Sequence, residues 1–299
     1  MRIGIIGGGA IGLLAAAKLS QHHQITLMTH TYRQADEINE KGISVLGEQG
    51  NDIYKNIFAI DIEKSKDTIR RQDLILLTVK QTALKRLLPL LDNKASAVVF
   101  LQNGMDHFNY MNGLEIASIY TGVVEHGSIR TNHTTVHHTG DGIIKIGLYS
   151  GLKVADIDSL NSAEFPVHFV TDIWSVHIEK LIVNSVINPL TSVLGVPNGE
   201  LITNTYYAKL VTSLCHEVCD SLSIAKAEHQ HYVDKIYTIC ERTAKNTSSM
   251  LKDLQLGRKT EIEAILGYCI HEAEKNNSPS PQSKLLFHMV RGLEESEEI

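Results

Sequence analysis

One stretch of the chain repeats a polar residue every four positions. Lys180, Asn184 and Asn188 stand in the segment KLIVNSVIN, and a helix turning by about 100° per residue places all three within an arc of about 80°. An ammonium group can donate a proton and amides can hold oxygen atoms, which suits a reaction that leaves negative charge on a substrate oxygen. Solvated helix faces usually mix Glu with Lys, so the pattern favours a cleft, and a solvated face is the alternative.

A glycine-rich turn near the start of the chain indicates phosphate binding. Residues 7–12 read GGGAIG, follow an apolar strand and open an apolar helix, which is the context that the pattern G-x-G-x-x-G requires. In such a turn the first glycine allows the tight bend, the second lets a pyrophosphate approach the backbone, and the third lets the helix pack closely. We predict a dinucleotide site here, with a ligand-free turn as the alternative; its residues are Gly7, Gly8, Gly9, Ala10, Ile11 and Gly12.

The end of the second predicted strand bears on which dinucleotide binds. A carboxylate there would bind a free ribose 2′-hydroxyl and repel a 2′-phosphate. The sequence reads MTHTYR at 28–33, and the first acidic residue follows only at Asp36. Arg33 and the two Thr hydroxyls could hold a 2′-phosphate, so NADP is favoured over NAD. A solvated Arg33 is the alternative.

Polar residues also follow two other predicted strands. Lys80 ends the apolar run 74–79, and Asn103 follows the run 97–101. Ligands of open α/β sheets bind outside the carboxyl ends of the strands, so both side chains are plausible cofactor contacts, although either could simply begin a loop. We expect Lys80 near the charged groups of the cofactor and Asn103 near the nicotinamide ribose.

Two further candidates lie at predicted helix starts. Thr260 and Glu263 have the spacing of a capping box, which leaves Glu261 without a capping role and available for a ligand. Ser248 and Ser249 begin another helical turn, where a helix cap and a ligand contact are equally open.

The elements that must position these residues change in character along the chain. The first half alternates short apolar runs with helical patterns, as in a parallel sheet covered by helices, and a hairpin over 134–147 turns at Gly140-Asp141. From about residue 172 onward, the apolar residues recur with the 3.6-residue period of a helix. We predict an α/β domain with a mostly parallel sheet over 1–170 and an all-α domain over 171–299. The predicted strands are 2–6, 24–28, 74–79, 97–101, 119–124 and 167–170, and the predicted helices are 11–20, 32–41, 82–90, 172–194, 205–227, 229–246, 260–275 and 282–294.

Composition argues against several classes of function. Lys and Arg number 28 against 34 Asp and Glu, and the net charge of -6 is opposite in sign to that of a typical nucleic-acid binder. The four cysteines form no Cys-x-x-Cys pair and the 15 histidines no metalloprotease motif, so we expect free thiols and no metal site. Since no run of ~20 apolar residues and no secretory signal is present, we expect a cytoplasmic protein that acts on a small molecule rather than a membrane.

These motifs together resemble the ketopantoate reductase (2-dehydropantoate 2-reductase) family over nearly the whole chain. The resemblance implies an N-terminal Rossmann domain, an all-helical second domain, and NADPH-dependent reduction of 2-dehydropantoate to (R)-pantoate on the route to pantothenate and coenzyme A. It rests on the turn at 7–12 and on the segments TVK at 78–80, QNGM at 102–105, KLIVNSVINPL at 180–190, PNGE at 197–200, SSML at 248–251 and KTEI at 259–262.

The resemblance also implies roles for single residues. Lys180 is expected to bind the substrate and to donate the proton that the reduced oxygen receives. The hydroxyl and carboxylate oxygens of the substrate are expected to contact Asn184, Asn188, Asn198 and Ser249. The expected cofactor contacts outside the glycine turn are Arg33, Lys80, Asn103, Ser128 and Glu261, with Glu261 at the junction between cofactor and substrate.

Two other functions stay open at this point. One is a related NAD(P)-dependent reductase of another 2-keto or 3-hydroxy acid, which a substrate panel would distinguish. The other is a catalytically silent NADP-sensing module, which would need the glycine turn but no proton donor such as Lys180. Apolar helical faces in the second half could pair two chains as a homodimer or could equally form a core.

Overall fold

The computed structural model describes residues 1–47 and 50–296, which divide into two compact units. The first unit comprises Met1–Gln102 and His107–Val176, and the second comprises Asn103–Asp106 and His177–Ile299. The chain therefore passes between the units inside the long helix α6 (Ile173–Leu194), a few residues after the predicted division at 170/171. The short segment 103–106 belongs to the second unit, although the strand before it belongs to the first.

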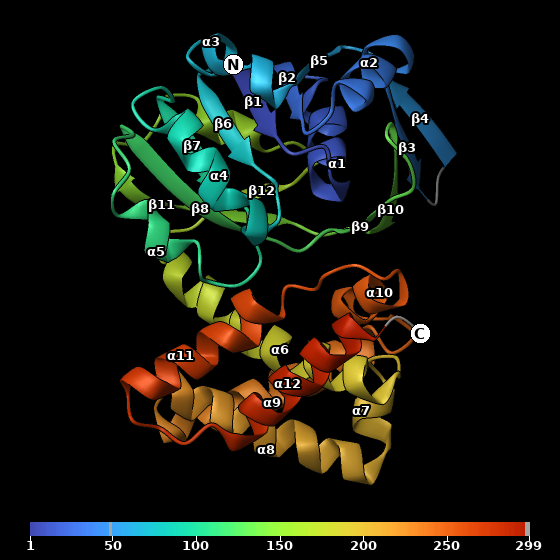
Figure 1. The fold of residues 1–299 in the computed structure, drawn as a ribbon, viewed down its shortest axis with the longest axis vertical. Helices are drawn as coiled ribbons and strands as arrows, with labels where there is room; N and C mark the ends of the chain where they lie inside the picture. Colours follow the sequence, from blue (N-terminus) through green and yellow to red (C-terminus); the bar gives the residue numbers. More distant parts are fainter. Residues whose placement is uncertain (48–49, 297–299) are drawn as a thin grey trace. The chain divides into compact units, whose positions relative to one another are not determined.

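An eight-stranded sheet forms the centre of the first unit (Figure 1). Its order is β12-β11-β8-β7-β6-β1-β2-β5, and every neighbouring pair is parallel except β8 and β11. Because β1 pairs with β2 on one side and β6 on the other, the strand order reverses there, and such switch points place ligands at the carboxyl ends of the strands. The strands are β1 (Arg2–Ile6), β2 (Gln24–Thr29), β5 (Ile57–Asp61), β6 (Leu74–Leu77), β7 (Ala97–Phe100), β8 (Ser118–Val124), β11 (Ile144–Gly151) and β12 (Val167–Phe169).

The first unit also contains a second sheet, which the sequence did not predict. Its order is β4-β3-β10-β9, with β3 and β10 parallel and the two outer pairs antiparallel. The strands are short, and the residues of β4 are almost all exposed, so they lack the buried alternation by which a strand is recognised. They are β3 (Ile43–Gly47), β4 (Gly50–Tyr54), β9 (Gly127–Arg130) and β10 (Thr135–Gly140).

The hairpin predicted over 134–147 is wrong. Strand β10 pairs with β9 in the second sheet, whereas β11 pairs with β8 in the main sheet, so the residues around Gly140-Asp141 connect two sheets. The actual hairpin joins β9 to β10, and its turn is held by Asn132, whose Oδ1 accepts a hydrogen bond from the Thr134 amide at 2.9 Å. β10 and β11 bury their apolar residues in different sheets. The alternation of apolar and polar residues within one strand does not show which sheet the strand joins.

Helix α1 (Ala10–Leu19) explains why two sheets are needed. Its sequence AIGLLAAAKL is apolar around almost its whole circumference, and Leu13 to Ala17 are fully buried. A helix of this kind must be covered on more than one side. The main sheet covers one side and strands of the second sheet contact another, as Figure 1 shows for β3 and β10 beside α1. The other helices of this unit are α2 (Tyr32–Lys41), α3 (Lys66–Ile69), α4 (Gln81–Leu91) and α5 (Phe108–Met111), with 3-10 turns at Ile62–Lys64 and Ile157–Leu160.

A buried histidine lies where the main sheet leads into β9. His126 is 9% exposed; its ring stacks on Phe165 with centroids 5.1 Å apart, and its Nδ1 lies 3.1 Å from Nε2 of His138. Burial lowers the pKa of His126 from 6.5 to about 4; repulsion from His138 and Lys18 acts in the same direction, and Asp141 and Glu125 oppose it. The folded protein therefore keeps this imidazole neutral at pH values where an unfolded chain would bind a proton.

We expect His126 to make the protein less stable in mild acid. Between pH 6.5 and about 4 the unfolded state binds the extra proton, so the free energy of unfolding falls as pH falls through that window. From about pH 7.5 to about pH 5 the loss attributable to His126 should be about 1 kcal/mol after allowance for solvent screening. Urea unfolding at the two pH values measures it. A His126→Phe variant should lose less stability than the wild type; an equal loss in both proteins would contradict the assignment.

The second unit contains only helices among its described residues, so the predicted fold class, a mostly parallel α/β domain followed by an all-α domain, is confirmed (Figure 1). Besides most of α6, a 3-10 turn lies at Lys226–Glu228 and a π-helical turn at Glu263–Gly267. The helices are α7 (Glu200–Thr203), α8 (Thr205–Ser221), α9 (His229–Arg242), α10 (Ser249–Gln255), α11 (Tyr268–Lys275) and α12 (Pro281–Glu295). Several are shorter than predicted: α8 ends at Ser221 rather than 227, and α9 ends at Arg242 rather than 246.

Buried carboxylates tie α12 to the rest of this unit. Glu217 accepts hydrogen bonds from the Ser283 amide and hydroxyl, both at 2.7 Å, at the first turn of α12. At the other end of α12, Glu294 accepts from the Thr260 amide at 2.7 Å and its hydroxyl at 2.6 Å. The predicted capping box of Thr260 with Glu263 is therefore wrong: Glu294, distant in sequence, takes the place of Glu263.

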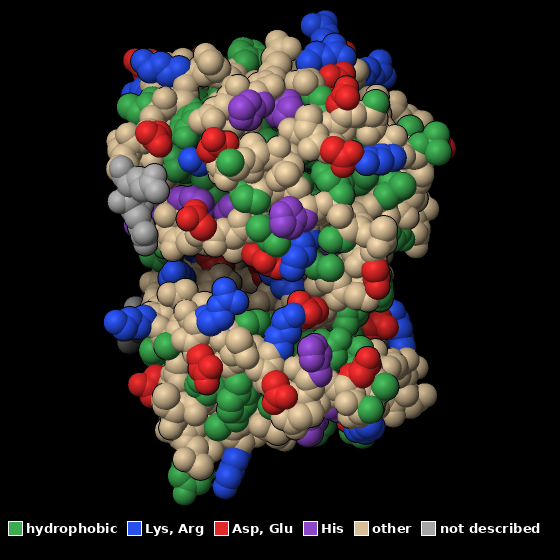
Figure 2. Space-filling view, turned by 180° about the vertical axis from the view of Figure 1, so that it is seen from behind, with side chains coloured by type: hydrophobic (Ala, Val, Ile, Leu, Met, Phe, Trp, Pro, Cys, Tyr) green, Lys and Arg blue, Asp and Glu red, His purple; other side chains and the backbone are tan. Residues whose placement is uncertain are grey.

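No helix in the described part of the chain has the length and apolar character needed to cross a bilayer. Figure 2 shows one face of the structure, on which Lys and Arg side chains lie among Asp and Glu side chains rather than in a separate stripe. The four cysteines are free thiols and all are buried. Within the described residues no group of three or more His, Cys, Asp or Glu side chains could hold a metal ion.

Candidate functional site

The glycine turn between β1 and α1 has the geometry of a phosphate-binding loop. Gly7 has a φ of +121°, which favours glycine, and its N–H donates to the Met28 carbonyl at 3.0 Å. A Cβ on Gly12 would lie 1.8 Å from the Gly7 carbonyl oxygen, so only glycine lets α1 start this close to the strand end. The close packing predicted for Gly12 is thus a steric requirement of the fold.

The residues at the start of α1 leave room for an anion. Gly9 is the N-cap of α1, and no side chain caps the helix there. A Cβ built on Gly9 would meet nothing within 4 Å, which means that the backbone is open on that side. Uncapped amides at a helix N-terminus attract negative charge. Residues 7–12 therefore fit the pyrophosphate of a dinucleotide.

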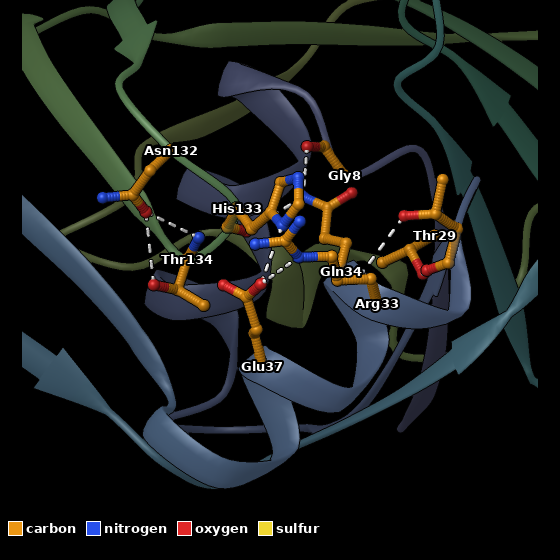
Figure 3. Close-up of polar contacts among 9 residues, drawn as sticks. Gly8, Thr29, Arg33, Gln34, Glu37, Asn132, His133 and Thr134 are labelled. Atoms are coloured by element: carbon orange, nitrogen blue, oxygen red, sulfur yellow. Dashed lines mark hydrogen bonds and ion pairs between the residues drawn. The ribbon is translucent and has the colours of Figure 1, made fainter.

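Two side chains that the sequence analysis missed hold this loop from outside. Nε2 of Gln34, on α2, donates to the Gly8 carbonyl at 2.8 Å, as Figure 3 shows, and also to the His133 carbonyl at 2.9 Å. Nη1 of Arg130, at the end of β9, donates to the same Gly8 carbonyl at 3.0 Å. Contacts to a backbone carbonyl leave no motif in a sequence, which is why neither residue stood out.

Helix α2, which follows β2, carries a carboxylate that pairs with Arg33 and that the sequence did not indicate. Arg33 is 80% exposed at its side chain and pairs with Glu37 one helical turn later, with Nε 2.9 Å from Oε1. His133 contacts the same carboxylate oxygen at 3.1 Å, and Figure 3 shows both groups directed to it. The hydrogen bond from Arg33, and to a smaller extent the one from His133, lowers the pKa of Glu37. Part of the charge of Arg33 is therefore balanced by Glu37, and its role at a 2′-phosphate stays a prediction.

The remaining predicted cofactor contacts of the first unit occupy different surroundings. Lys80 is the exposed N-cap residue of α4, and β6 ends at Leu77, earlier than the apolar run 74–79 that Lys80 was predicted to end. Ser128 lies in β9 of the second sheet, half-buried, and its hydroxyl is buried without a hydrogen-bond partner in the described structure.

In the second unit three of the predicted residues form one hydrogen-bonded chain. Nζ of Lys180 donates to Oδ1 of Asn103 at 3.0 Å, and Nδ2 of Asn103 donates to Oε2 of Glu261 at 2.8 Å. The amide must be oriented this way because an ammonium group can only donate and a carboxylate only accept. A cation, an amide and an anion are thus held in series, although the first and second are 77 residues apart and the second and third 158.

The segment that presents Asn103 is docked against the π-helical turn. The Met105 amide donates to the Ala264 carbonyl at 3.3 Å, and Met105 is fully buried. Gly104 has a φ of +74°, and a Cβ there would lie 2.0 Å from the Ala264 carbonyl oxygen. Backbone contact this close fixes Asn103 relative to Glu261, which lies just before the turn. π-Helical turns recur at functional sites, consistent with this arrangement.

The three asparagines that are predicted to contact the substrate lie on α6 and in the loop that follows it. Asn184 is half-buried and Asn188 is 6% exposed, so the polar stripe that they share with Lys180 is not a solvated helix face. Asn198 is buried, donates through Nδ2 to Thr243 Oγ1 at 2.9 Å, and has an unpartnered Oδ1 within the described structure. No hydrogen bond that the structure describes joins these amides to Asn103 or Glu261.

The two serines have different roles. Ser248 is the N-cap of α10, and its Oγ accepts from the Leu251 amide at 3.2 Å. The hydroxyl of Thr191 on α6 donates to the same oxygen at 2.7 Å. Ser249, by contrast, is exposed and begins α10. The helix cap is therefore Ser248, which leaves Ser249 available for a ligand.

Comparison with known proteins places this arrangement in a family. The model described as "Ketopantoate reductase PanE/ApbA" matches residues 3–151, and its C-terminal counterpart matches residues 172–294. A relative named 2-dehydropantoate 2-reductase in Bacillus subtilis (strain 168) is 36% identical, covering 98% of each chain.

Solved structures agree. A probable 2-dehydropantoate 2-reductase from Bacillus subtilis superimposes with a TM-score of 0.88 at 34% identity, over 98% of this chain and 100% of that one. The ternary structure of D-mandelate dehydrogenase with NADH and anilino(oxo)acetate has a TM-score of 0.86 at 23% identity over the full length of both chains, a likeness in fold. Both family models, the full-length relative and the glycine loop followed by the Lys180–Asn103–Glu261 chain give one result: this chain belongs to the ketopantoate reductase family.

Proposed function

We propose that the protein catalyses the NADPH-dependent reduction of 2-dehydropantoate to (R)-pantoate, the reaction by which its full-length relatives are named. The observation that carries the proposal is the hydrogen-bonded series Lys180–Asn103–Glu261. A protein that only senses a dinucleotide needs the phosphate loop, but it has no use for an ammonium group held by an amide and a carboxylate.

The reaction requires a proton donor at the substrate ketone. A nicotinamide cofactor held at the glycine loop would supply the hydride for the C2 carbon, and the negative charge left on the oxygen must be neutralised. In our proposal Lys180 binds that oxygen and transfers a proton from Nζ to it. Asn103 accepts a hydrogen bond from Nζ and so limits where the ammonium group can point.

Glu261 acts on this donor through Asn103. Its carboxylate accepts from Nδ2 at 2.8 Å, which polarises the amide and strengthens the hydrogen bond that Oδ1 accepts from Lys180. Asn184, Asn188, Asn198 and Ser249 are proposed to hold the hydroxyl and carboxylate oxygens of the substrate. The unpartnered Oδ1 of Asn198 supports this, because a buried carbonyl oxygen without a donor matches a substrate hydroxyl.

We also propose that the dinucleotide contacts are the glycine loop, Lys80, Asn103, Ser128 and Glu261, with Arg33 at the 2′-phosphate. The unpartnered hydroxyl of Ser128 supports its inclusion.

A cytoplasmic location is part of the proposal, and the four free, buried thiols support it. A homodimer is also part of the proposal. Helix α12 carries two exposed apolar residues four positions apart, Leu285 and Met289, which support it.

The cofactor preference is tested at Arg33. We expect Arg33→Ala to raise KM for NADPH about tenfold, because a charge-assisted hydrogen bond to the 2′-phosphate is lost, and to leave KM for NADH unchanged. Glu37→Gln is the matched control: it removes the carboxylate that pairs with Arg33 and should not weaken NADPH binding. An equal rise in KM for both cofactors would mean that Arg33 does not read the 2′-phosphate.

The substrate is tested with a panel of 2-keto acids under identical conditions. The proposal expects kcat/KM for 2-dehydropantoate to exceed the values for pyruvate, 2-ketoisovalerate and phenylglyoxylate, because only 2-dehydropantoate has a hydroxyl for the asparagine amides. A higher value for phenylglyoxylate would instead favour a function like that of D-mandelate dehydrogenase, which shares this fold.

A further inference from the structure

Arg130 brings a positive charge to the phosphate loop from the second sheet. It is the last residue of β9, and its Nη1 lies 3.0 Å from the Gly8 carbonyl oxygen. The loop itself, GGGAIG at 7–12, contains no charged residue, and the first turn of α1 has no acidic one. The guanidinium group therefore adds a charge that the loop lacks.

The two donors to the Gly8 carbonyl differ in what else they can bind. Gln34 is 4% exposed, and both its contacts go to backbone carbonyls, those of Gly8 and His133 (Figure 3). Both side-chain N–H donors of Gln34 are thus used by contacts within the protein. Arg130 is exposed and carries five N–H donors, of which the contact to Gly8 uses one. Further donors of the same group can bind a ligand beside the loop.

Within residues 1–47 and 50–296, no carboxylate forms an ion pair with Arg130. Arg33 pairs with Glu37 at 2.9 Å, whereas Arg130 forms no ion pair with any carboxylate that the structure describes. In a protein with a net charge of -6, a guanidinium that lies against an anion-binding loop and pairs with no described carboxylate is suited to an anionic ligand.

We propose that Arg130 binds the pyrophosphate of the dinucleotide, the part that NADH and NADPH share. The proposal rests on the dinucleotide binding that the proposed function requires, and it adds to the proposed contacts a second residue of β9, two positions after Ser128. Strand β9 then does more than pair with β10: it delivers a phosphate ligand.

The experiment measures binding of NADPH and of NADH separately, by nicotinamide fluorescence without substrate, over a series of salt concentrations. Arg130→Gln should raise Kd by about tenfold or more for both cofactors and by the same factor, since the lost contact is charge-assisted and common to both. It should also make Kd less dependent on salt, because one cation fewer meets the phosphates. Arg130→Lys should recover part of the affinity and most of the salt dependence.

Gln34→Leu is the matched control. It removes the other donor to the Gly8 carbonyl without changing the charge, so it should leave the salt dependence as in the wild type. Wild-type Kd values for Arg130→Gln would overturn the proposal, as would a loss whose salt dependence matches that of Gln34→Leu, which would make Arg130 a support of the loop only. A loss confined to NADPH would place Arg130 at the 2′-phosphate instead. If the wild-type protein bound neither cofactor, the proposed function itself would fail.

Discussion

Replacing Lys180 by alanine should lower kcat for 2-dehydropantoate by about a hundredfold or more, because the developing alkoxide then lacks its proton donor. The effect should appear in kcat as well as in kcat/KM, since the interaction is strongest when charge has formed on the oxygen. Steady-state kinetics of the variant with saturating NADPH measures both quantities, and the Kd of NADPH in the absence of substrate should stay near the wild-type value.

Lys180→Arg separates proton transfer from charge. A guanidinium group keeps the positive charge and can still contact Asn103, but it does not give up a proton at neutral pH. We expect its KM to be closer to that of the wild type and its kcat to stay low. A kcat for either variant within a few-fold of the wild type would rule out Lys180 as the acid.

Gly104→Ala should be the second most damaging substitution, although Gly104 touches no substrate. A Cβ would meet the Ala264 carbonyl oxygen at 2.0 Å and the φ of +74° would be strained, so residues 103–106 must move off the π-helical turn. Asn103 would move with them, and misplacement of a positioned group by about 1 Å can cost about a hundredfold in rate. We expect kcat to fall by that order while the Kd of NADPH changes less.

Gly151→Ala provides a control with the same steric problem elsewhere. Gly151 is the last residue of β11 and has a φ of +90°, and a Cβ there would lie 1.9 Å from the Ala117 carbonyl oxygen. Both variants should lose thermal stability, but only Gly104→Ala should lose kcat when each is assayed well below its Tm. Equal kcat values for the two variants would show that Gly104 matters for folding and not for the placement of Asn103.

Local patterns were enough to predict the helical unit and most strands of the main sheet, but not its edge strand β5. Apolar runs gave β1, β2, β6, β7 and β8, and the glycine turn was recognised because a strand precedes it and a helix follows it. Non-local pairing was not accessible in the same way. The β9–β10 hairpin is nested between β8 and β11, so a turn signal at Gly140-Asp141 was read as a hairpin although it connects two sheets.

The candidate site shows the same difference between local patterns, which the sequence reveals, and non-local contacts, which it does not. Lys180, Asn103 and Glu261 were each chosen from the sequence, but their contact depends on tertiary structure that no spacing encodes. The role of Thr260 was misjudged because Glu294, which accepts from it, comes from α12. Gln34 and Arg130 were missed because they bind a backbone carbonyl. The apolar circumference of α1 was the one signal that could have indicated the second sheet.

The most direct test of the account is the decay of nicotinamide absorbance when 2-dehydropantoate is added to the wild-type protein with NADPH, with NADH as the comparison. We predict turnover with NADPH, pantoate formed in equal amount to the NADPH consumed, and slower turnover with NADH. No consumption of either cofactor, in a protein that binds NADPH tightly, would contradict the account and would favour another keto acid or a protein that senses the dinucleotide without reducing a substrate.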